Sequence, residues 1–152
     1  MSGRDLVVLG TASQAPTRTR NHNGYLLRWD REGLLFDPGE GTQRQFAFAG
    51  VSPGRITRIL LTHLHGDHCL GLPGILQRLA LDGADSEVPV HFPASGLPWV
   101  ERLCDSSIGG RIRVQLEPVD DAGAVVAETP LRITALPLEH RVPTLGWRVQ
   151  EP

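Results

Sequence analysis

The sequence predicts a mixed α/β fold in which helices cover one face of a sheet. Three observations support this class. Short apolar runs alternate with helical patterns along the first two thirds of the chain, and the last third alternates apolar and polar residues as half-buried strands do. The length of 152 residues suits one domain with a sizeable core. Glycine and proline punctuate the segments and stay below the proportion typical of disorder.

The N-terminal region predicts three strands. The apolar run 6–9, which Gly10 ends, is typical of a buried strand. Residues 25–29 and 34–36 flank the polar turn 30–33, so we expect them to pair as a β-hairpin.

The middle of the chain predicts alternating helices and strands. Residues 42–49 have a helical pattern, and Gly50 stands just beyond its end. The apolar run 56–62 predicts a buried strand, and 70–81 predicts a helix with one apolar stripe. Alternating apolar residues over 88–92 predict a further strand.

The last third of the chain begins with one helix and then changes character. Residues 95–104 predict a helix that places Trp99 and Val100 on one apolar face. Residues 112–116, 131–135 and 145–149 each alternate apolar and polar side chains, as half-buried strands do. No later helix follows, so we expect the second face of the sheet to lack a helical cover.

Composition excludes several classes of protein. The net charge of −2 gives no global basic balance for nucleic acid, and two cysteines cannot build a disulfide scaffold. No apolar run reaches the length of a signal peptide core or of a membrane span. We therefore expect a soluble cytoplasmic protein without membrane association.

The most informative segment is the pattern H-x-H-x-D-H formed by His63, His65, Asp67 and His68. At this composition, a random chain would contain that pattern in about one case in two thousand. The pattern follows a predicted strand and precedes a predicted helix, where open α/β sheets often carry functional groups. On extended backbone His63 and His65 point to the same side, whereas Asp67 and His68 follow the Gly66 turn and can face a second ion.

Imidazole and carboxylate ligands suit Zn²⁺, and Mn²⁺ or iron are alternatives by ligand type. One alternative interpretation is a loop of surface histidines. Another is a structural zinc site, but such sites usually use cysteines, and Cys69 and Cys104 lack the C-x-x-C spacing. We expect Cys69 to pack as a small buried apolar residue.

The motif resembles the signature of the metallo-β-lactamase superfamily, and further stretches narrow the resemblance to the ribonuclease Z family of tRNA 3′-processing endonucleases. These stretches follow the family's order and spacing across essentially the whole chain. They are VLGT at 8–11, PTRTRN at 16–21, FDPGEGTQ at 36–43, GLPG at 71–74, HRVP at 140–143 and GWRVQE at 146–151.

The resemblance implies a metal ligand set. His63, His65 and His140 would hold one zinc, and Asp67 and His68 would contribute to a second, with Mn²⁺ as an alternative metal. Asp67 would also orient or deprotonate the water that the metals share. Without the resemblance, His140 would be interpreted as a structural histidine that follows a strand.

Four other polar residues are weaker candidates. Asp37 ends a strand and is expected either to orient a metal-bound histidine or to serve as a plain turn residue. Arg18, Arg20 and Asn21 form a polar loop that would contact RNA phosphates, the alternative being a solvated loop. His22 and His91 are assigned no role, and His91 is expected on the solvent face of its strand.

The resemblance covers only one half of the family's fold. Ribonuclease Z resembles a sandwich of two similar halves, with an αββα order of layers, and residues 1–152 match the N-terminal half. A bridging Asp, two further His and the arm that grips tRNA have no counterpart here. An uncovered sheet face would expose apolar surface. We therefore expect the chain to be a segment of a longer enzyme, or to be completed by another chain.

The leading hypothesis is a zinc-dependent endoribonuclease that removes 3′ trailers from precursor tRNA and leaves a 3′-hydroxyl. Its family is typically homodimeric. One alternative is another hydrolase of this fold that acts on phosphodiesters or sulfate esters. A further alternative is a non-catalytic metal-binding half-domain that needs a partner chain.

Overall fold

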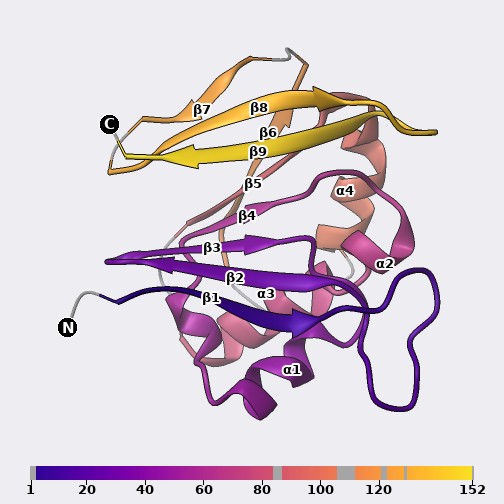
Figure 1. The fold of residues 1–152 in the computed structure, drawn as a ribbon, viewed down its shortest axis with the longest axis vertical. Helices are drawn as coiled ribbons and strands as arrows, with labels where there is room; N and C mark the ends of the chain where they lie inside the picture. The colour runs from indigo at the N-terminus through magenta and orange to yellow at the C-terminus, as the bar shows by residue number, and fades with distance from the viewer. Residues whose placement is uncertain (1–2, 84–86, 106–111, 121–122, 129, 152) are drawn as a thin grey trace.

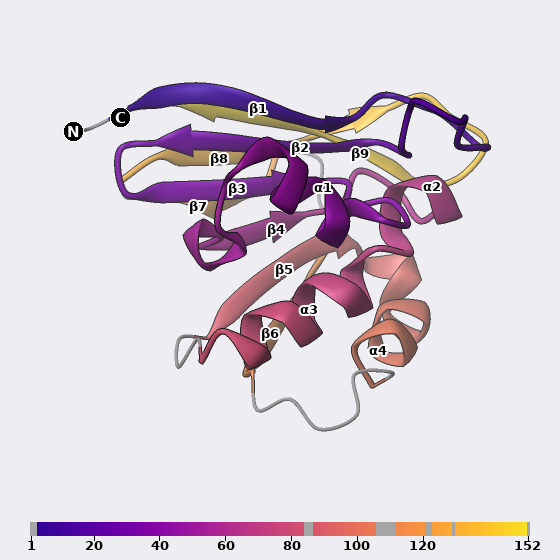
Figure 2. The same cartoon turned by 90° about the horizontal axis from the view of Figure 1, so that it is seen from below.

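The structure is a computed structural model that describes residues 3–83, 87–105, 112–120, 123–128 and 130–151. It has three layers: a three-stranded sheet, a six-stranded sheet and a layer of helices (Figures 1 and 2). The predicted mixed α/β class is confirmed. None of the helices in the described ranges is long and apolar enough to cross a membrane.

The six-stranded sheet has the order β1-β2-β3-β4-β5-β6. β1 pairs antiparallel with β2, and β2 pairs antiparallel with β3 because the hairpin predicted over 25–36 forms. From β3 to β6 the pairs are parallel, because helices provide the crossovers between those strands. The strands are β1 Arg4–Gly10, β2 Gly24–Trp29, β3 Glu32–Phe36, β4 Arg58–Leu60, β5 Val88–Pro93 and β6 Val114–Val119.

The helices cover one face of this sheet, as predicted (Figure 2). Their buried stripe packs against β-strand side chains in the main core, which includes Phe46, Ile75 and Leu76. Cys69 is fully buried in that core and so packs as the sequence predicts. The helices are α1 Thr42–Ala49, α2 Gly66–Cys69, α3 Leu72–Leu81 and α4 Leu97–Asp105, with short 3₁₀ turns η1 Pro53–Arg55 and η2 Ala94–Gly96.

A second sheet covers much of the other face, so the expectation that this face would be open is wrong over β3 and β4. Its strands are β7 Val125–Ala127, β8 Arg132–Leu138 and β9 Thr144–Gln150, all paired antiparallel. Leu34 and Leu60 of the first sheet form a buried cluster with Leu131 and Ile133. Two of the three alternating segments of the last third, 131–135 and 145–149, thus stack in a separate layer, whereas 112–116 contributes to β6 of the first sheet.

The expectation of a buried first strand is wrong for one of its two faces, whereas on the other face Leu9 is buried in the main core. β1 lies at the edge of the six-stranded sheet, and Leu6 and Val8 are more than half exposed. Leu6 pairs with Leu27, which packs in the cluster between the two sheets, and directly paired residues share a face. The exposed side chains of β1 therefore belong to the inter-sheet face, at a margin that the three-stranded sheet leaves uncovered.

Two side chains differ from the sequence interpretation in their exposure. His91 was expected on a solvent face, but only 3% of it is exposed, and its ring lies 6.2 Å from that of Trp147. The second sheet buries His91, and strand periodicity alone does not predict where that sheet packs. Trp99 was expected on the apolar face of its helix but is 42% exposed, whereas Val100 is fully buried there.

Candidate metal centre

The H-x-H-x-D-H segment spans the connection between β4 and α2 and continues into α2 itself. β4 ends at Leu60, and His63 and His65 follow on non-helical backbone before α2 begins at Gly66. The second sheet is tied to this connection by a hydrogen bond of 2.8 Å from Leu145 N to Thr62 O. That tie brings the segment after β8, which contains His140, to the same end of the sheet.

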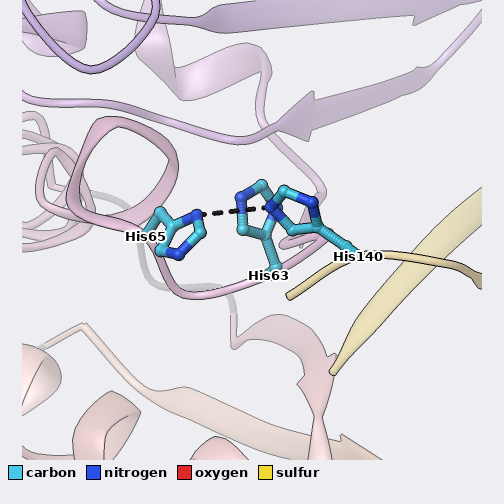
Figure 3. A group of neighbouring side chains, drawn as sticks. All are labelled: His63, His65 and His140. Atoms are coloured by element: carbon cyan, nitrogen blue, oxygen red, sulfur yellow. Dashed lines mark hydrogen bonds between the residues drawn. The ribbon is translucent and has the colours of Figure 1, made fainter. Parts of the chain in front are cut away.

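Three imidazoles converge there (Figure 3). One ligand nitrogen from each of His63, His65 and His140 lies within 4.8 Å of the other two. His140 Nε2 is 3.4 Å from His65 Nδ1, and the ring centroids of His63 and His140 are 4.8 Å apart. The structure thus brings together three ligand candidates from two loops about 75 positions apart in sequence.

The electrostatic setting keeps at least one of these rings in the form that binds metal. Burial, and then the charge of His68, lower the pKa of His63 to about 4. A neutral imidazole has a free lone pair for a metal ion, whereas a protonated one does not. Three crowded imidazole nitrogens, one of them neutral at ordinary pH, therefore fit a divalent ion such as Zn²⁺.

Asp67 and His68 lie on α2 beside this cluster. Asp67 is buried, its Oδ2 lies 3.4 Å from His68 Nε2, and the rings of His63 and His68 have centroids 4.1 Å apart. All five predicted ligands line one cleft of about 480 Å³. Its described lining residues are Ser13, Gln14, His63, His65, Asp67, His68, His140 and Arg141.

Asp37 holds His68 and Thr62 in place through hydrogen bonds. Its Oδ2 accepts a hydrogen bond from His68 Nδ1 at 3.0 Å, and its two carboxylate oxygens accept from the backbone N and the hydroxyl of Thr62, both at 2.7 Å. Burial alone would lower the pKa of His68, but the hydrogen bond to Asp37 and the nearby carboxylates outweigh it and raise that pKa. Asp37 adopts a left-handed backbone conformation with φ 45°, which a short polar side chain tolerates.

Several residues at the site were not predicted from the sequence. Thr62 links two groups, because its hydroxyl lies 2.7 Å from Asp37 and 2.9 Å from His63 Nδ1. Asn23 Nδ2 lies 3.2 Å from His68 Nε2, although the two residues are 45 positions apart. Arg141 follows the candidate ligand His140 directly, and that adjacency is the signal that could have identified it.

The predicted RNA-binding loop follows Ser13 and Gln14, which line the cleft, but is not itself part of the described lining. Arg18 and Arg20 are exposed, and neither is among the lining residues. The loop closes on itself through a hydrogen bond of 2.9 Å from Thr17 N to Arg20 O. Asn21 uses its side-chain amide to donate to Glu40 O at 2.9 Å, which ties the loop to the segment before α1.

The chain is similar to several known proteins. A family model described as the metallo-beta-lactamase superfamily matches residues 17–148. Curated proteins named Ribonuclease Z from Nocardia farcinica and Salinispora arenicola are 58% and 54% identical, over 100% of this chain and 50% of each relative. The chain therefore spans about half the length of these relatives. A crystal structure of human tRNase Z, short form, matches with a TM-score of 0.85 and 28% identity, over 96% of this chain and 63% of that one.

Proposed function

The chain belongs to the metallo-β-lactamase superfamily, and from that premise we propose that it provides the metal-binding half of a ribonuclease Z. The reaction is metal-dependent endonucleolytic removal of 3′ trailers from precursor tRNA, which leaves a 3′-hydroxyl. The observation that carries the proposal is the convergence of His63, His65 and His140 in one cleft with Asp67 and His68. Relatives named Ribonuclease Z at 58% and 54% identity support the choice of substrate.

Each metal position has its own candidate ligands in this proposal. His63, His65 and His140 hold one zinc, and Asp67 and His68 contribute to a second, with Mn²⁺ as an alternative. When bound, the two ions supply the Lewis acidity that makes hydroxide available near neutral pH and that stabilises phosphodiester oxygens during in-line displacement.

In this proposal, Asp67 accepts a proton, and Asp37 and Thr62 orient the histidine rings. Asp67 is buried at the cleft wall, and in this proposal its carboxylate orients the attacking water and accepts its proton. Asp37 fixes the ring of His68 through Nδ1, which leaves Nε2 directed away from that hydrogen bond. Thr62 extends the same support to His63.

The rest of the active enzyme lies outside these residues in our proposal. The relatives are about twice as long as this chain, and the remaining metal ligands and the tRNA-gripping arm come from the further half. The exposed Leu6 and Val8 at the margin of the inter-sheet face are apolar surface that such a half covers. Arg18, Arg20 and Asn21 contact RNA phosphates, and the complete cytoplasmic enzyme is a homodimer.

The deciding experiment assays the full-length protein on precursor tRNA in the presence of zinc or manganese. Cleavage at the 3′ end of the mature sequence, leaving a 3′-hydroxyl, is the expected result. If precursor tRNA stays intact while bis(p-nitrophenyl) phosphate is hydrolysed, the protein is a different hydrolase of the same fold. Failure to hydrolyse either substrate, with metal bound, would indicate a non-catalytic metal-binding module.

A further inference from the structure

Arg141 is the cation that the cleft wall itself provides. Among the described residues that line the cleft, it carries the one guanidinium group, and the neutral donors Ser13 and Gln14 share the wall. The remaining lining residues are the five candidate metal ligands. A guanidinium presents five N–H donors in a planar fork that matches the oxygens of a phosphate.

The backbone around Arg141 is held on both sides. On one side, His140 places its ring 3.4 Å from His65 within the three-histidine cluster. On the other side, Thr144 Oγ1 donates to Val142 O at 2.8 Å, and Leu145 N donates to Thr62 O at 2.8 Å. The backbone of Arg141 is therefore held in place next to the candidate metal ligand His140. Its side chain is exposed and can reach a bound polymer.

The positive charge of Arg141 matters because little else in the lining of the cleft can attract a polyanion. The protein carries a net charge of −2, so no general basic surface attracts a polyanion. Asp67 adds a negative charge inside the cleft, and Arg18 and Arg20 do not line it. Among the described residues that line the cleft, Arg141 is the arginine that can attract an RNA backbone in addition to the metal ions, while Arg18 and Arg20 act outside the lining.

We propose that Arg141 binds the phosphate next to the scissile one, and so makes the cleft select a polynucleotide over an isolated phosphodiester. The inference rests on the proposed function, because it assumes that the two metal positions take the scissile phosphate. Because the metal ions would neutralise the charge of the scissile phosphate, the Arg141 guanidinium is available for the neighbouring phosphate of the RNA. Ser13 and Gln14 offer hydrogen bonds to the sugar or base between the two phosphates.

The test compares two substrates in the full-length, metal-loaded protein. The variants are Arg141→Ala, the charge-conserving Arg141→Lys and the control Arg102→Ala, which removes an exposed arginine on α4. Arg141→Ala is expected to lower kcat/KM for precursor tRNA roughly ten- to a hundredfold, the loss typical of one charge-assisted contact. Its kcat/KM for bis(p-nitrophenyl) phosphate, which has no neighbouring phosphate, is expected to stay within about twofold. Arg141→Lys restores part of the loss, and Arg102→Ala changes neither value.

A binding measurement separates failure of this inference from failure of the proposed function. The dissociation constant of mature tRNA is measured over a range of salt concentrations, and Arg141→Ala is expected to reduce the slope of log Kd against log salt by about one. An equal loss on both substrates, no loss on either, or an unchanged salt slope would each overturn the inference. If wild-type protein does not cleave precursor tRNA, the proposed function is wrong, and the salt slope alone then decides the role of Arg141.

Discussion

Two histidines with similarly lowered pKa values occupy opposite settings in the fold. His63 lines a cleft together with other histidines, whereas His91 is buried between the two sheets beside Trp147. His91 Nε2 contacts Arg58 Nη1 at 2.5 Å, and in the part of the chain that the structure describes its Nδ1 is buried without a hydrogen-bond partner. Burial first, and then the charge of Arg58, lower the pKa of His91 to about 4.

This setting predicts acid sensitivity. Between about pH 6.5 and about pH 4, the unfolded chain binds a proton at His91 that the folded chain does not, so the free energy of unfolding falls as the pH falls. From about pH 7 to about pH 4.5, we expect His91 to cost about 2 kcal/mol of stability. The substitution His91→Gln keeps an acceptor for Arg58 and removes this contribution.

Urea unfolding of the wild type and of His91→Gln at the two pH values measures the effect. The contribution of His63 is common to both proteins and cancels in the comparison. An equal loss of stability in the two proteins on acidification would show that His91 is not the sensitive group.

The three-histidine cluster predicts a second residue-level effect. His65→Ala removes one of the three converging ligands, so a divalent ion keeps only two imidazoles at that position. In the full-length protein, we expect turnover of bis(p-nitrophenyl) phosphate to fall about a hundredfold or more, with loss of bound metal. Elemental analysis measures the metal, and circular dichroism checks that the fold persists. Turnover near the wild-type value would refute the metal assignment.

At the scale of elements, α1 shows how far periodicity alone is informative. The predicted range 42–49 coincides with the observed helix, because glycines in left-handed conformation stand on both sides of it. The same periodicity divides its two phenylalanines. Phe46 is 1% exposed in the main core, whereas Phe48 is 67% exposed.

The two phenylalanines of α1 form a matched pair for testing. Phe46→Ala empties a site between the helix and the sheet and is expected to lower the free energy of unfolding by about 3–5 kcal/mol. Phe48→Ala removes an exposed ring that contacts Arg44, and its effect is expected to stay within about 0.5 kcal/mol. Urea unfolding measures both values. Similar losses from the two variants would mean that the assignment of the buried face is wrong.

At the scale of the whole molecule, the margin of the inter-sheet face remains apolar and exposed. Leu6 and Val8 on β1 are exposed at this margin. Leu136 and Leu138 on β8 are also exposed, but on the outer face of the three-stranded sheet, opposite the buried Ile133 and Ala135. The three-stranded sheet covers β3 and β4 but not β1. A fold with these uncovered side chains is expected to gain stability from a further layer or partner.

The same incompleteness predicts how this chain behaves by itself. Among the described residues, the candidate metal ligands are the three histidines His63, His65 and His140, with Asp67 and His68 beside them. We therefore expect the isolated 152-residue chain to bind well under two zinc ions and to leave bis(p-nitrophenyl) phosphate intact. Elemental analysis after dialysis, with the full-length protein as the control, measures the zinc content. Two tightly held zinc ions per chain would contradict this expectation.

The sequence by itself determined the fold class, the metal motif and most of the strand and helix order, but not the short helix α2 or the short strand β7. These follow from local properties: apolar periodicity, glycine positions and the spacing of His63, His65, Asp67 and His68, which share one short segment. The resemblance to a family added His140, which lines the cleft, and the strand-end position singled out Asp37, which accepts a hydrogen bond from His68.

Only the tertiary structure decided which strands form which sheet, and therefore which side chains are buried. Alternation gives each strand one apolar face, but the partner of that face is set by packing between segments distant in sequence. For this reason Leu6 is exposed where a buried strand was expected, and His91 is buried where solvent was expected. The same long-range packing brings Asn23 to His68, 45 positions away, and brings the loop of His140 and Arg141 to the cleft that His63 and His65 line.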